Sequence, residues 1–361
     1  MELLSVTMND GVKPRSEIEG KDNSSEDKSN YKIVRKGDMV YNSMRMWQGA
    51  NGISPCDGIV SPAYTVLMPK QEINNGYFAA FFKSANLINE FRKNSQGMTS
   101  DTWNLKYPQI ETIKIQIPSI SEQDKVSELF GVLDARIVAQ AQLVESLKKY
   151  KRGLLRTVFS EKGSHSLLHD AVSHRIDEVC DVLSGKRIPK GETFSPRPTE
   201  YRYITVSDMG EKYVSSDTLQ FITSHTEKQI TRYKVRNGDI IISVAGTLGK
   251  LNIITPDLDG VNLTENCDRF TNFRGINPEY LYHVLSSDLI QSQIEASKTK
   301  NGQPKLALER IRNFVVPVPH QIRQEQFVGV MNSIDKYIAS QQAVLDRCCK
   351  ARAGLQQQLF I

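Results

Sequence analysis

The sequence lacks long apolar runs and has few cysteines. No stretch approaches the roughly 18 consecutive apolar residues that a membrane-spanning helix needs, and the opening residues MELLSVTMND do not have the layout of a signal peptide. We therefore expect no membrane partner. The five cysteines form no CxxC pair and no disulfide framework, so a reducing, cytoplasmic setting is the expectation.

Two short motifs for nucleotide or cofactor chemistry are present only in incomplete form. Ala245–Lys250 (AGTLGK) resembles a phosphate-binding loop, but Val244 stands where the motif needs glycine and Leu251 where it needs serine or threonine. Asn277–Tyr280 (NPEY) faintly resembles the NPPY motif of adenine methyltransferases, with glutamate replacing the second proline. We expect this segment to begin a helix, since proline is favoured at an early helical position.

Metal and nuclease sites are also not indicated. His165, His169 and His174 lie in one polar segment, but their spacing is uneven and no cysteine is near. The acidic residues form no recognisable nuclease cluster. The sequence therefore predicts neither catalytic residues nor a metal site.

Length and composition are those of an ordinary globular protein with room for two domains. The chain has 361 residues, of which 39% are hydrophobic and 24% charged. Its formal net charge is +5. This mild excess permits a polyanionic partner without requiring one.

Two long helices are the strongest feature of the sequence. From about Glu122 to Phe159 the apolar residues recur at alternating steps of four and three, and the pattern returns from Arg323 to Leu359, 201 residues later. Such a seven-residue repeat keeps one seam of a helix against a partner and drives left-handed supercoiling. The predicted seam residues are Val126, Phe130, Leu133, Ile137, Gln140, Val144 and Leu147, and Phe327, Met331, Ile334, Ile338, Gln341, Leu345 and Cys348.

Polar residues interrupt both seams at matching places. Gln140 corresponds to Gln341, and Lys151 corresponds to Arg352. A polar residue in a seam costs stability but fixes the register of the pair. We therefore expect the two helices of this chain to pair with each other.

The repeat continues into the segments before the helices. Val34–Val40 matches Val235–Ile241, and each predicts a strand entered through a hairpin-type turn at Lys-Gly or Asn-Gly. Leu4–Thr7 resembles Ile204–Ser207 in the same way. Each half therefore predicts a mixed domain of strands and helices.

Two further elements complete each half. Tyr77–Phe91 predicts one short amphipathic helix, with Glu279–Ile294 as its counterpart. Alternating apolar residues predict a strand just before each long helix, closed by proline. These alternating residues are Ile113, Ile115 and Ile117 in the first half and Phe314, Val316 and Val318 in the second.

The fold class is therefore α+β, with two mixed α/β domains joined by two long coiled-coil helices in an internal pseudo-twofold repeat. The second half has a predicted strand and turn over Ile176–Lys190, and the first half lacks their equivalent. We expect the first domain to be N-terminally shortened or completed from elsewhere. The predicted limits are 1–118 and 173–319 for the domains, 119–160 and 320–361 for the helices, and 161–172 for the linker.

Three stretches give the sequence a family resemblance. Lys36–Ala50 (KGDMVYNSMRMWQGA), Ser95–Asp101 followed by Trp103 and Asn104, and Ile117–Lys125 resemble segments of the specificity subunits of type I restriction-modification enzymes. The resemblance implies a subunit that reads double-stranded DNA without catalysis of its own. Each target-recognition domain would read one half of a split site, and the antiparallel helices would set the spacer.

The resemblance also implies the partners. They are two copies of an adenine methyltransferase subunit and a restriction subunit that translocates DNA. S-adenosylmethionine, ATP and Mg²⁺ would belong to those subunits, so no cofactor is expected in this chain. The alternative is a structural coiled-coil adaptor whose globular ends bind proteins; such an adaptor would not bind DNA in a salt-dependent way.

Candidate DNA-binding residues offer hydrogen bonds, stacking surfaces or positive charge. Base edges are read by paired donors and acceptors, whereas lysines suit phosphates. The alternative interpretation is that the first-domain residues decorate a strand and that the second-domain lysines lie in an ordinary solvated loop. The candidates are Asn42, Arg45, Trp47, Gln48, Thr99 and Asp101 in the first domain, and Lys250, Asn252, Lys298, Lys300, Gln303 and Lys305 in the second.

Overall fold

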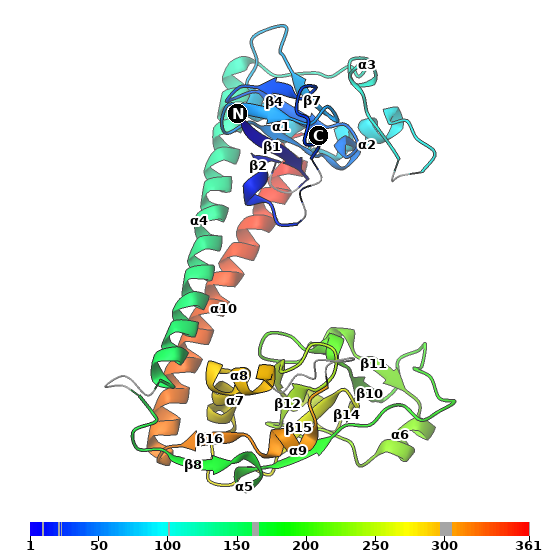
Figure 1. Ribbon diagram of the computed structural model, residues 1–361. Coiled ribbons are helices and arrows are strands. Elements are labelled where there is room, and N and C mark those ends of the chain that lie inside the picture. The colour runs from blue at the N-terminus through cyan, green and yellow to red at the C-terminus, as the bar shows by residue number, and fades with distance from the viewer. Residues whose placement is uncertain are drawn as a thin grey trace. The chain divides into compact units, whose positions relative to one another are not determined.

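The computed structural model describes residues 1–8, 11–20, 22, 24–99, 102–160, 166–296 and 305–360 (Figure 1). The chain forms two compact units. Unit 1 consists of Met1–Val144 and Ser340–Ile361, and unit 2 of Glu145–Ala339. Because each unit contains part of both long helices, the units do not coincide with the predicted domain limits, which stay predictions.

Unit 1 contains two small sheets, one of four strands in the order β2-β1-β6-β3 and one of three in the order β5-β4-β7. In the first sheet β1 runs parallel to β6 and antiparallel to β2. The strands are β1 (Glu2–Thr7), β2 (Gly11–Pro14), β3 (Lys32–Val34), β4 (Met39–Asn42), β5 (Asn51–Ile53), β6 (Gly58–Val60) and β7 (Tyr64–Leu67).

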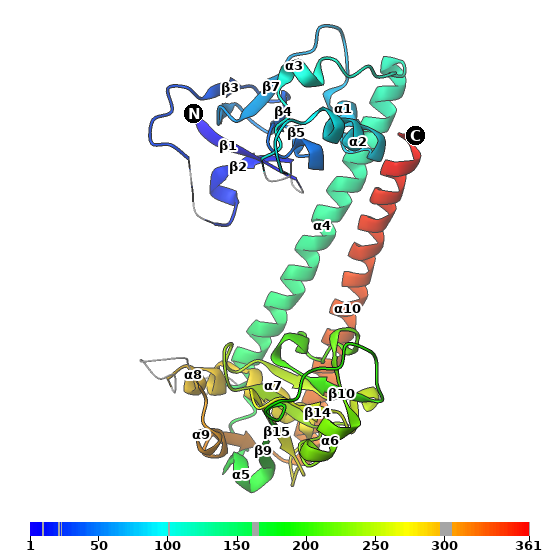
Figure 2. The same cartoon turned by 90° about the vertical axis from the view of Figure 1, so that its right-hand side faces the viewer.

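The central strand of unit 1 is buried on both faces. Side chains alternate between the two faces of a strand, so Val40 packs into a core between the two sheets while Met39 and Tyr41 pack on the opposite side. That opposite side is covered by helices α1 (Asn75–Phe81) and α2 (Ala85–Asn94) and by the long helices (Figure 2).

Unit 2 repeats this plan with additional elements. Its main sheet has the order β13-β12-β15-β9, beside the sheets β11-β10-β14 and β16-β8. The strands are β8 (Val172–Arg175), β9 (Asp181–Ser184), β10 (Tyr201–Ile204), β11 (Gln220–Ile222), β12 (Ile240–Ser243), β13 (Leu251–Ile253), β14 (Asn262–Leu263), β15 (Cys267–Thr271) and β16 (Val315–Val318).

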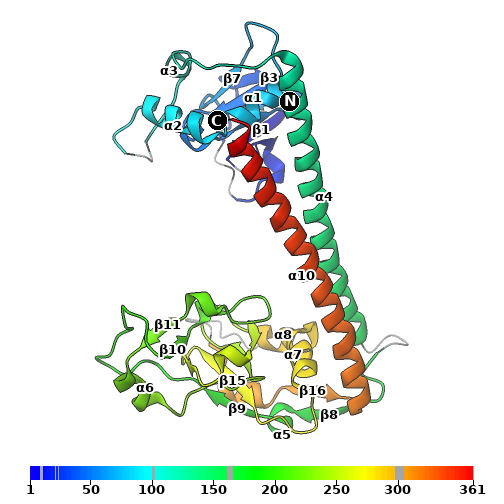
Figure 3. The ribbon, with the colours of Figure 1, turned by 180° about the vertical axis from the view of Figure 1, so that it is seen from behind.

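The core of unit 2 is arranged as in unit 1. Ile241 packs between sheets, whereas Ile240 and Ile242 face the helices. These three isoleucines have no exposed surface, and each such burial contributes about 1.5–3 kcal/mol. The helices of this unit are α5 (Ile176–Val179), α6 (Ser224–Ile230), α7 (Pro278–Ser286) and α8 (Asp288–Ala296) (Figure 3), followed by α9 (Leu308–Arg312) (Figure 1).

The two long helices are confirmed. They are α4 (Ile120–Val158) and α10 (Gln321–Gln358), and in each unit the parts of them that it contains run side by side (Figure 1). In unit 1 the Gln140 Nε2 donates to the Gln341 Oε1 at 2.9 Å, so the two polar seam residues meet. All fourteen predicted seam residues are buried or half-buried; the complete seam assignment stays a prediction.

Each unit also contains one ion pair between the two helices. Arg352 pairs with Asp134 in unit 1, and Lys151 pairs with Asp335 in unit 2. Both the cations and the acids are separated by 201 residues, so the pairs are equivalents in the repeat. The polar seam positions therefore select specific partners on the opposite helix.

Four predictions about local structure are wrong. The Lys-Gly and Asn-Gly turns do not close hairpins, because β3 pairs with β6 whereas β4 pairs with β5 and β7. The turn at Gly37 (φ +92°) carries the chain from one sheet to the other, and Gly238 (φ +82°) does the same. Positive φ explains the glycine at both positions.

The single helix over Tyr77–Phe91 is in fact two helices. Ser84 interrupts the pattern and caps α2, since its side chain accepts a hydrogen bond from the Leu87 N–H at 3.4 Å. The counterpart in unit 2 breaks in the same way between α7 and α8, at Ser287. Serine competes for local backbone groups, which favours a cap over a helix interior.

The predicted strand over Ile113–Ile117 is absent, although its equivalent β16 forms. In unit 2, β16 pairs with β8, whereas no described segment of unit 1 pairs with residues 113–117. The segment Ile176–Lys190, predicted as a strand and a turn, contains α5 followed by β9.

All five cysteine thiols are free. Burial raises the pKa of Cys180 and of Cys267 to about 12, so both are unreactive as nucleophiles. Cys348 in the predicted seam is half-buried. Within the described part of the chain, no helix is long and apolar enough to cross a membrane.

Candidate nucleic-acid interface

The last residue of β4 and the loop that follows it to β5 carry four of the candidate DNA-binding residues, and the backbone there is held by hydrogen bonds. The Asn42 N–H donates to the Ala50 carbonyl at 2.9 Å, and the Arg45 N–H donates to the Asn42 carbonyl at 3.0 Å. The Asn42 side-chain oxygen accepts from the Met44 N–H at 3.1 Å. The side-chain oxygen of Asn42 therefore stabilises the loop, and its side-chain amide nitrogen is left for other partners.

A buried methionine anchors the loop. Met46 has no exposed surface and packs with Tyr41 and Phe91. Gly49 closes the loop with φ +84°, a conformation that L side chains rarely adopt. The neighbouring side chains are thus presented from a fixed backbone.

Two tryptophans stand side by side on this surface. The rings of Trp47 and Trp103 meet edge to face, with centroids 5.1 Å apart and planes at 76°. The Trp47 Nε1 donates to the Met44 carbonyl at 3.1 Å, and the Arg92 guanidinium lies over the Trp47 ring at 5.7 Å. Edge-to-face pairs and cation–π contacts each contribute about 0.5–1.5 kcal/mol, so this cluster is a rigid platform.

Arg45 and Gln48 have side chains available for a ligand. Arg45 is exposed and Gln48 half-buried, and neither side chain forms a hydrogen bond or ion pair with another described residue. Thr99 is exposed on the adjoining hairpin, where its N–H donates to the Thr102 hydroxyl at 3.1 Å. Asp101 lies outside the described residues.

The equivalent loop of unit 2, between β12 and β13, presents different groups. The Lys250 amine donates to the Met209 carbonyl, so it is turned toward the protein. Asn252 has no exposed surface, and its amide donates to the Gly210 carbonyl at 3.2 Å. In this arrangement both side chains stabilise the unit, so neither is carried into the interface that we propose below.

Of the remaining candidates of unit 2, the structure describes Lys305. Lys305 is exposed and forms a β-bridge with Ala245. Lys298, Lys300 and Gln303 lie outside the described residues. A small pocket of about 410 Å³ adjoins Lys305 and includes Ser184, Glu265 and Asp268. Burial raises the pKa of the Asp268 carboxyl.

One glutamine in each unit ties the domain to its long helix. The Gln123 side chain of α4 accepts from the Asn74 N–H at 3.0 Å, and the Gln324 side chain of α10 accepts from the Asn277 N–H at 2.7 Å. Each glutamine amide also donates to the carbonyl of the proline before its helix. Both glutamines are 1–2% exposed, so each bond is made away from water.

Sequence reasoning missed these glutamines and Arg92. A signal for the glutamines was available, since Gln123 and Gln324 are separated by the repeat distance of 201 and each lies in the first turn of a helix. Arg92 lies in the last turn of α2 beside Lys93. Its contact with Trp47 depends on tertiary packing, which spacing does not reveal.

The Asn277–Tyr280 motif has a structural role. Asn277 caps α7, with its side chain accepting from the Glu279 and Tyr280 N–H groups at 2.9 and 3.2 Å, as predicted. Among the described residues, no group of three or more His, Cys, Asp or Glu side chains is placed to hold a metal ion. His165 lies outside them.

Comparison with protein families identifies the chain. The model of the type I restriction modification DNA specificity domain matches residues 5–149 and 169–347, which is most of the sequence. The MjaVIII specificity subunit of Methanocaldococcus jannaschii is 22% identical over 91% of this chain and 79% of its own length. The EcoBI specificity subunit of Escherichia coli is 29% identical over 62% of this chain and 47% of its own length.

Solved structures have the same fold. A chain from a structure concerned with the assembly and conformational transition of a type I R-M system matches with a TM-score of 0.60, at 18% identity, over 91% of this chain and 83% of that one. The S subunit of the type I restriction-modification system of M. genitalium matches with a TM-score of 0.56, at 16% identity, over 91% of this chain and 84% of that subunit. The chain therefore belongs to the specificity subunits of type I restriction-modification systems, the non-catalytic subunits of these enzymes.

Proposed function

We propose that this specificity subunit reads a two-part DNA site, one half with each unit, and docks the methyltransferase and restriction subunits of its system. The observation that carries the proposal is the duplicated frame: a loop after the central buried strand, two short helices behind it, and a buried glutamine that ties them to a long helix. Two equivalent readers suit a site made of two half-sites.

In unit 1 the DNA-facing surface is the loop 42–50 with the adjoining hairpin. Arg45 supplies a bidentate donor for a guanine or a phosphate, and Gln48 supplies a donor and an acceptor for an adenine edge. Trp47 and Trp103 pack against each other beside these residues in the sequence, with Arg92 adding positive charge over the Trp47 ring. Asn42 and Thr99 complete the surface.

In unit 2 we propose DNA contacts by Lys305 and, on the sequence alone, by Lys298, Lys300 and Gln303. The three lysines would contact phosphates and so position the unit on the duplex, while sequence would be read by other side chains of the unit. S-adenosylmethionine, ATP and Mg²⁺ are assigned to the partner subunits.

A binding measurement at several salt concentrations tests DNA reading. The chain, alone and with its methyltransferase subunit, is titrated onto a labelled duplex at about 50 and 200 mM salt, since phosphate contacts release counterions. We expect the affinity to fall steeply with salt and to depend on sequence. Salt-independent binding, or none in either form, would favour a protein-binding adaptor and overturn the proposal.

A further inference from the structure

Lys212 connects the domain of unit 2 to the long helices. Its amine donates to the Asn332 side-chain oxygen at 3.0 Å and to the Asp335 carboxylate at 3.1 Å, both on α10. Asp335 is also the partner of Lys151 on α4. One carboxylate of α10 therefore binds a lysine of the other long helix and a lysine of the domain.

These charged groups are largely shielded from water. The side chains of Lys212, Asp335 and Lys151 are 13%, 21% and 20% exposed. Burial would raise the pKa of Asp335, but the two lysines hold that pKa below its usual value. The buried Oε2 of Glu279 on α7 has no hydrogen-bond partner among the described residues, and the Lys212 amine lies 3.8 Å from it. Loss of Lys212 would therefore leave the Glu279 charge uncompensated.

The segment that carries Lys212 is itself bound to the start of β13. The side chains of Lys250 and Asn252 both donate to backbone carbonyls of this segment, residues 209–213. The Ile253 N–H donates to the Lys212 carbonyl at 2.9 Å. Because the segment is fixed to β13 in this way, Lys212 connects that strand with α10.

The loop 244–250, which leads into β13, lies beside the described candidate for DNA contact in unit 2. Ala245 forms a β-bridge with Lys305, and the Leu306 N–H donates to the Val244 carbonyl at 2.9 Å. A series of direct contacts therefore leads from Lys305 through the loop, β13 and Lys212 to the long helix α10.

The contact of Lys212 is the second polar attachment of the domain along α10. Gln324 makes the first, and Asp335 lies 11 residues further along the helix, or about 16 Å. Phe327 and Met331 between them pack into the core of the unit, but apolar packing is not directional. Two polar contacts so far apart fix the angle between the domain and α10, whereas one alone would allow the domain to tilt.

Unit 1 has only one of the three acidic or amide groups that surround Lys212. The other two positions are glycines, which have no side-chain acceptor. This equivalence follows from the repeat distance of 201 on the long helices and from the matching asparagine caps of α1 and α7. The equivalents of Asn332, Asp335 and Glu279 are Gly131, Asp134 and Gly76.

We propose that Lys212 is a positioning residue, which holds the DNA-binding surface of unit 2 at one angle to the long helices and so restricts the spacer that the subunit accepts. This inference rests on the proposed function. Lys212 does not bind DNA itself, since its amine is occupied by Asn332 and Asp335. A recognition site works only when it is held within roughly 10–20° of its productive geometry. Without Lys212 the surface tilts, and half-sites at a different separation come within its reach.

Discrimination between spacers tests this role. The subunit, in complex with its methyltransferase partner, is titrated onto duplexes that carry the two-part site found by methylation mapping. The spacer is the native one, or one base pair shorter or longer. We expect the unchanged complex to bind the shifted duplexes at least about ten-fold more weakly than the native one, and the Lys212→Met complex to discriminate by less than about three-fold.

Asn332→Ala is a second variant of the same contact. It removes an acceptor of Lys212 from α10 and leaves the pair of Asp335 with Lys151 in place. Discrimination between spacers should fall in this variant too. Combined with Lys212→Met it should cause no further loss, because both changes remove one interaction.

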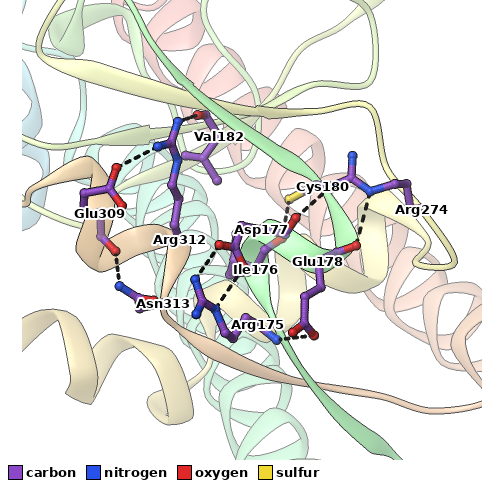
Figure 4. Close-up of polar contacts among 10 residues, drawn as sticks. All are labelled: Arg175, Ile176, Asp177, Glu178, Cys180, Val182, Arg274, Glu309, Arg312 and Asn313. Carbon is purple, nitrogen blue, oxygen red and sulfur yellow. Dashed lines mark hydrogen bonds and ion pairs between the residues drawn. The ribbon is translucent and has the colours of Figure 1, made fainter.

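Arg274→Met is the matched control, because Arg274 is a cation that stabilises unit 2 at another place. It donates to the Asp181 carboxylate of β9 and to the Asp177 carbonyl of α5, both at 2.8 Å (Figure 4). Its loss should lower the stability of unit 2 and leave discrimination between spacers unchanged.

Hydrogen exchange adds a measurement that does not involve DNA. In Lys212→Met the amide groups of residues 209–213 and 251–253 should exchange faster, since local opening there becomes easier. Residues 181–184 should keep their protection. In Arg274→Met the two regions should respond in the opposite way.

Four results would overturn the positioning role. They are unchanged discrimination in Lys212→Met and Asn332→Ala, an equal loss of discrimination in Arg274→Met, equally weakened binding of all three duplexes, and unchanged exchange at residues 209–213 in Lys212→Met. If Lys212→Met does not fold, Asn332→Ala decides. Binding by the unchanged complex that does not depend on sequence would overturn the proposed function as well, so the two failures are distinguishable.

Discussion

At the scale of single residues, some side chains of the loop 42–50 in unit 1 shape the loop, and others are available to a ligand. Asn42 and Trp47 hydrogen-bond within the loop, and Met46 anchors it. Arg45 projects from this frame without an ion-pair partner among the described residues. It is therefore the residue for which the proposed DNA contact is most easily separated from a structural role.

Replacing Arg45 tests that contact. Arg45→Ala should weaken binding of DNA that carries the recognised site by about 1–3 kcal/mol, roughly 5- to 150-fold, because a bidentate donor is lost. Thermal stability should not change, as the side chain is exposed. Arg35→Ala is the control, since Arg35 is also exposed but pairs with Asp57 at 3.1 Å outside this loop. Equal effects of the two changes on binding would contradict the role of Arg45.

A buried histidine makes the stability of unit 2 dependent on pH. His283 is 1% exposed, and burial, reinforced by the charges of Lys151 and Lys212, lowers its pKa from 6.5 to about 3. The unfolded chain therefore binds a proton between pH 6.5 and 3 that the folded unit does not bind. Stability is lost as the pH falls through that window.

The expected loss from His283 is about 1.4 kcal/mol per pH unit below 6.5, or about 2 kcal/mol at pH 5. Denaturant unfolding at pH 7 and pH 5 measures it. His283→Gln should reduce the difference between the two pH values, whereas His320→Gln, at an exposed position, should leave it unchanged. An unchanged pH dependence in His283→Gln would show that other groups are responsible.

At the scale of elements, the periodic pattern of apolar residues predicted the two long helices, whose formation depends on local spacing. The seven-residue repeat placed α4 and α10 to within two residues at their ends, and the offset of 201 predicted that Gln140 would correspond to Gln341. Their hydrogen bond shows that these seam positions meet. The spacing of apolar residues predicts such helices well because these residues form the buried stripe along the helix.

Elements that depend on distant partners were not predictable in this way. Ile113–Ile117 alternates as β16 does, yet only β16 has a strand to pair with. The turns at Gly37 and Gly238 were predicted to close hairpins. That prediction was wrong because a turn signal does not specify which sheet the next strand enters. The same limit applies to the interface: Arg45 and Trp47 were identified from one contiguous motif, whereas Arg92 reaches Trp47 only through the packing of α2.

The long helices lead to a prediction about spacing. Inserting one heptad into each helix, after Gln142 and after Val344, preserves the seam and adds up to about 10 Å, or roughly three base pairs. If the helices separate the two readers, the spacer of the recognised site should lengthen while both half-sites stay the same. Methylation mapping would measure this. An unchanged spacer would contradict the role of the helices as a ruler.

At the scale of the whole molecule, the repeat gives two units that share the same arrangement of elements but present different side chains at their surfaces. The frame consists of the buried central strand, the paired short helices and the glutamine tie. The surfaces diverge: unit 1 presents two tryptophans and Arg45, and the corresponding loop of unit 2 turns Lys250 and Asn252 inward. Units that differ in this way are expected to read different half-sites.

The central claim is tested most directly by mapping adenine methylation in cells that express this chain with its methyltransferase partner. We expect one two-part motif with a fixed spacer. Replacing Ser173–Arg312 with the equivalent segment of a relative should change one half of that motif and leave the other half and the spacer intact. A contiguous motif, or a change in both halves, would contradict independent reading by the two units.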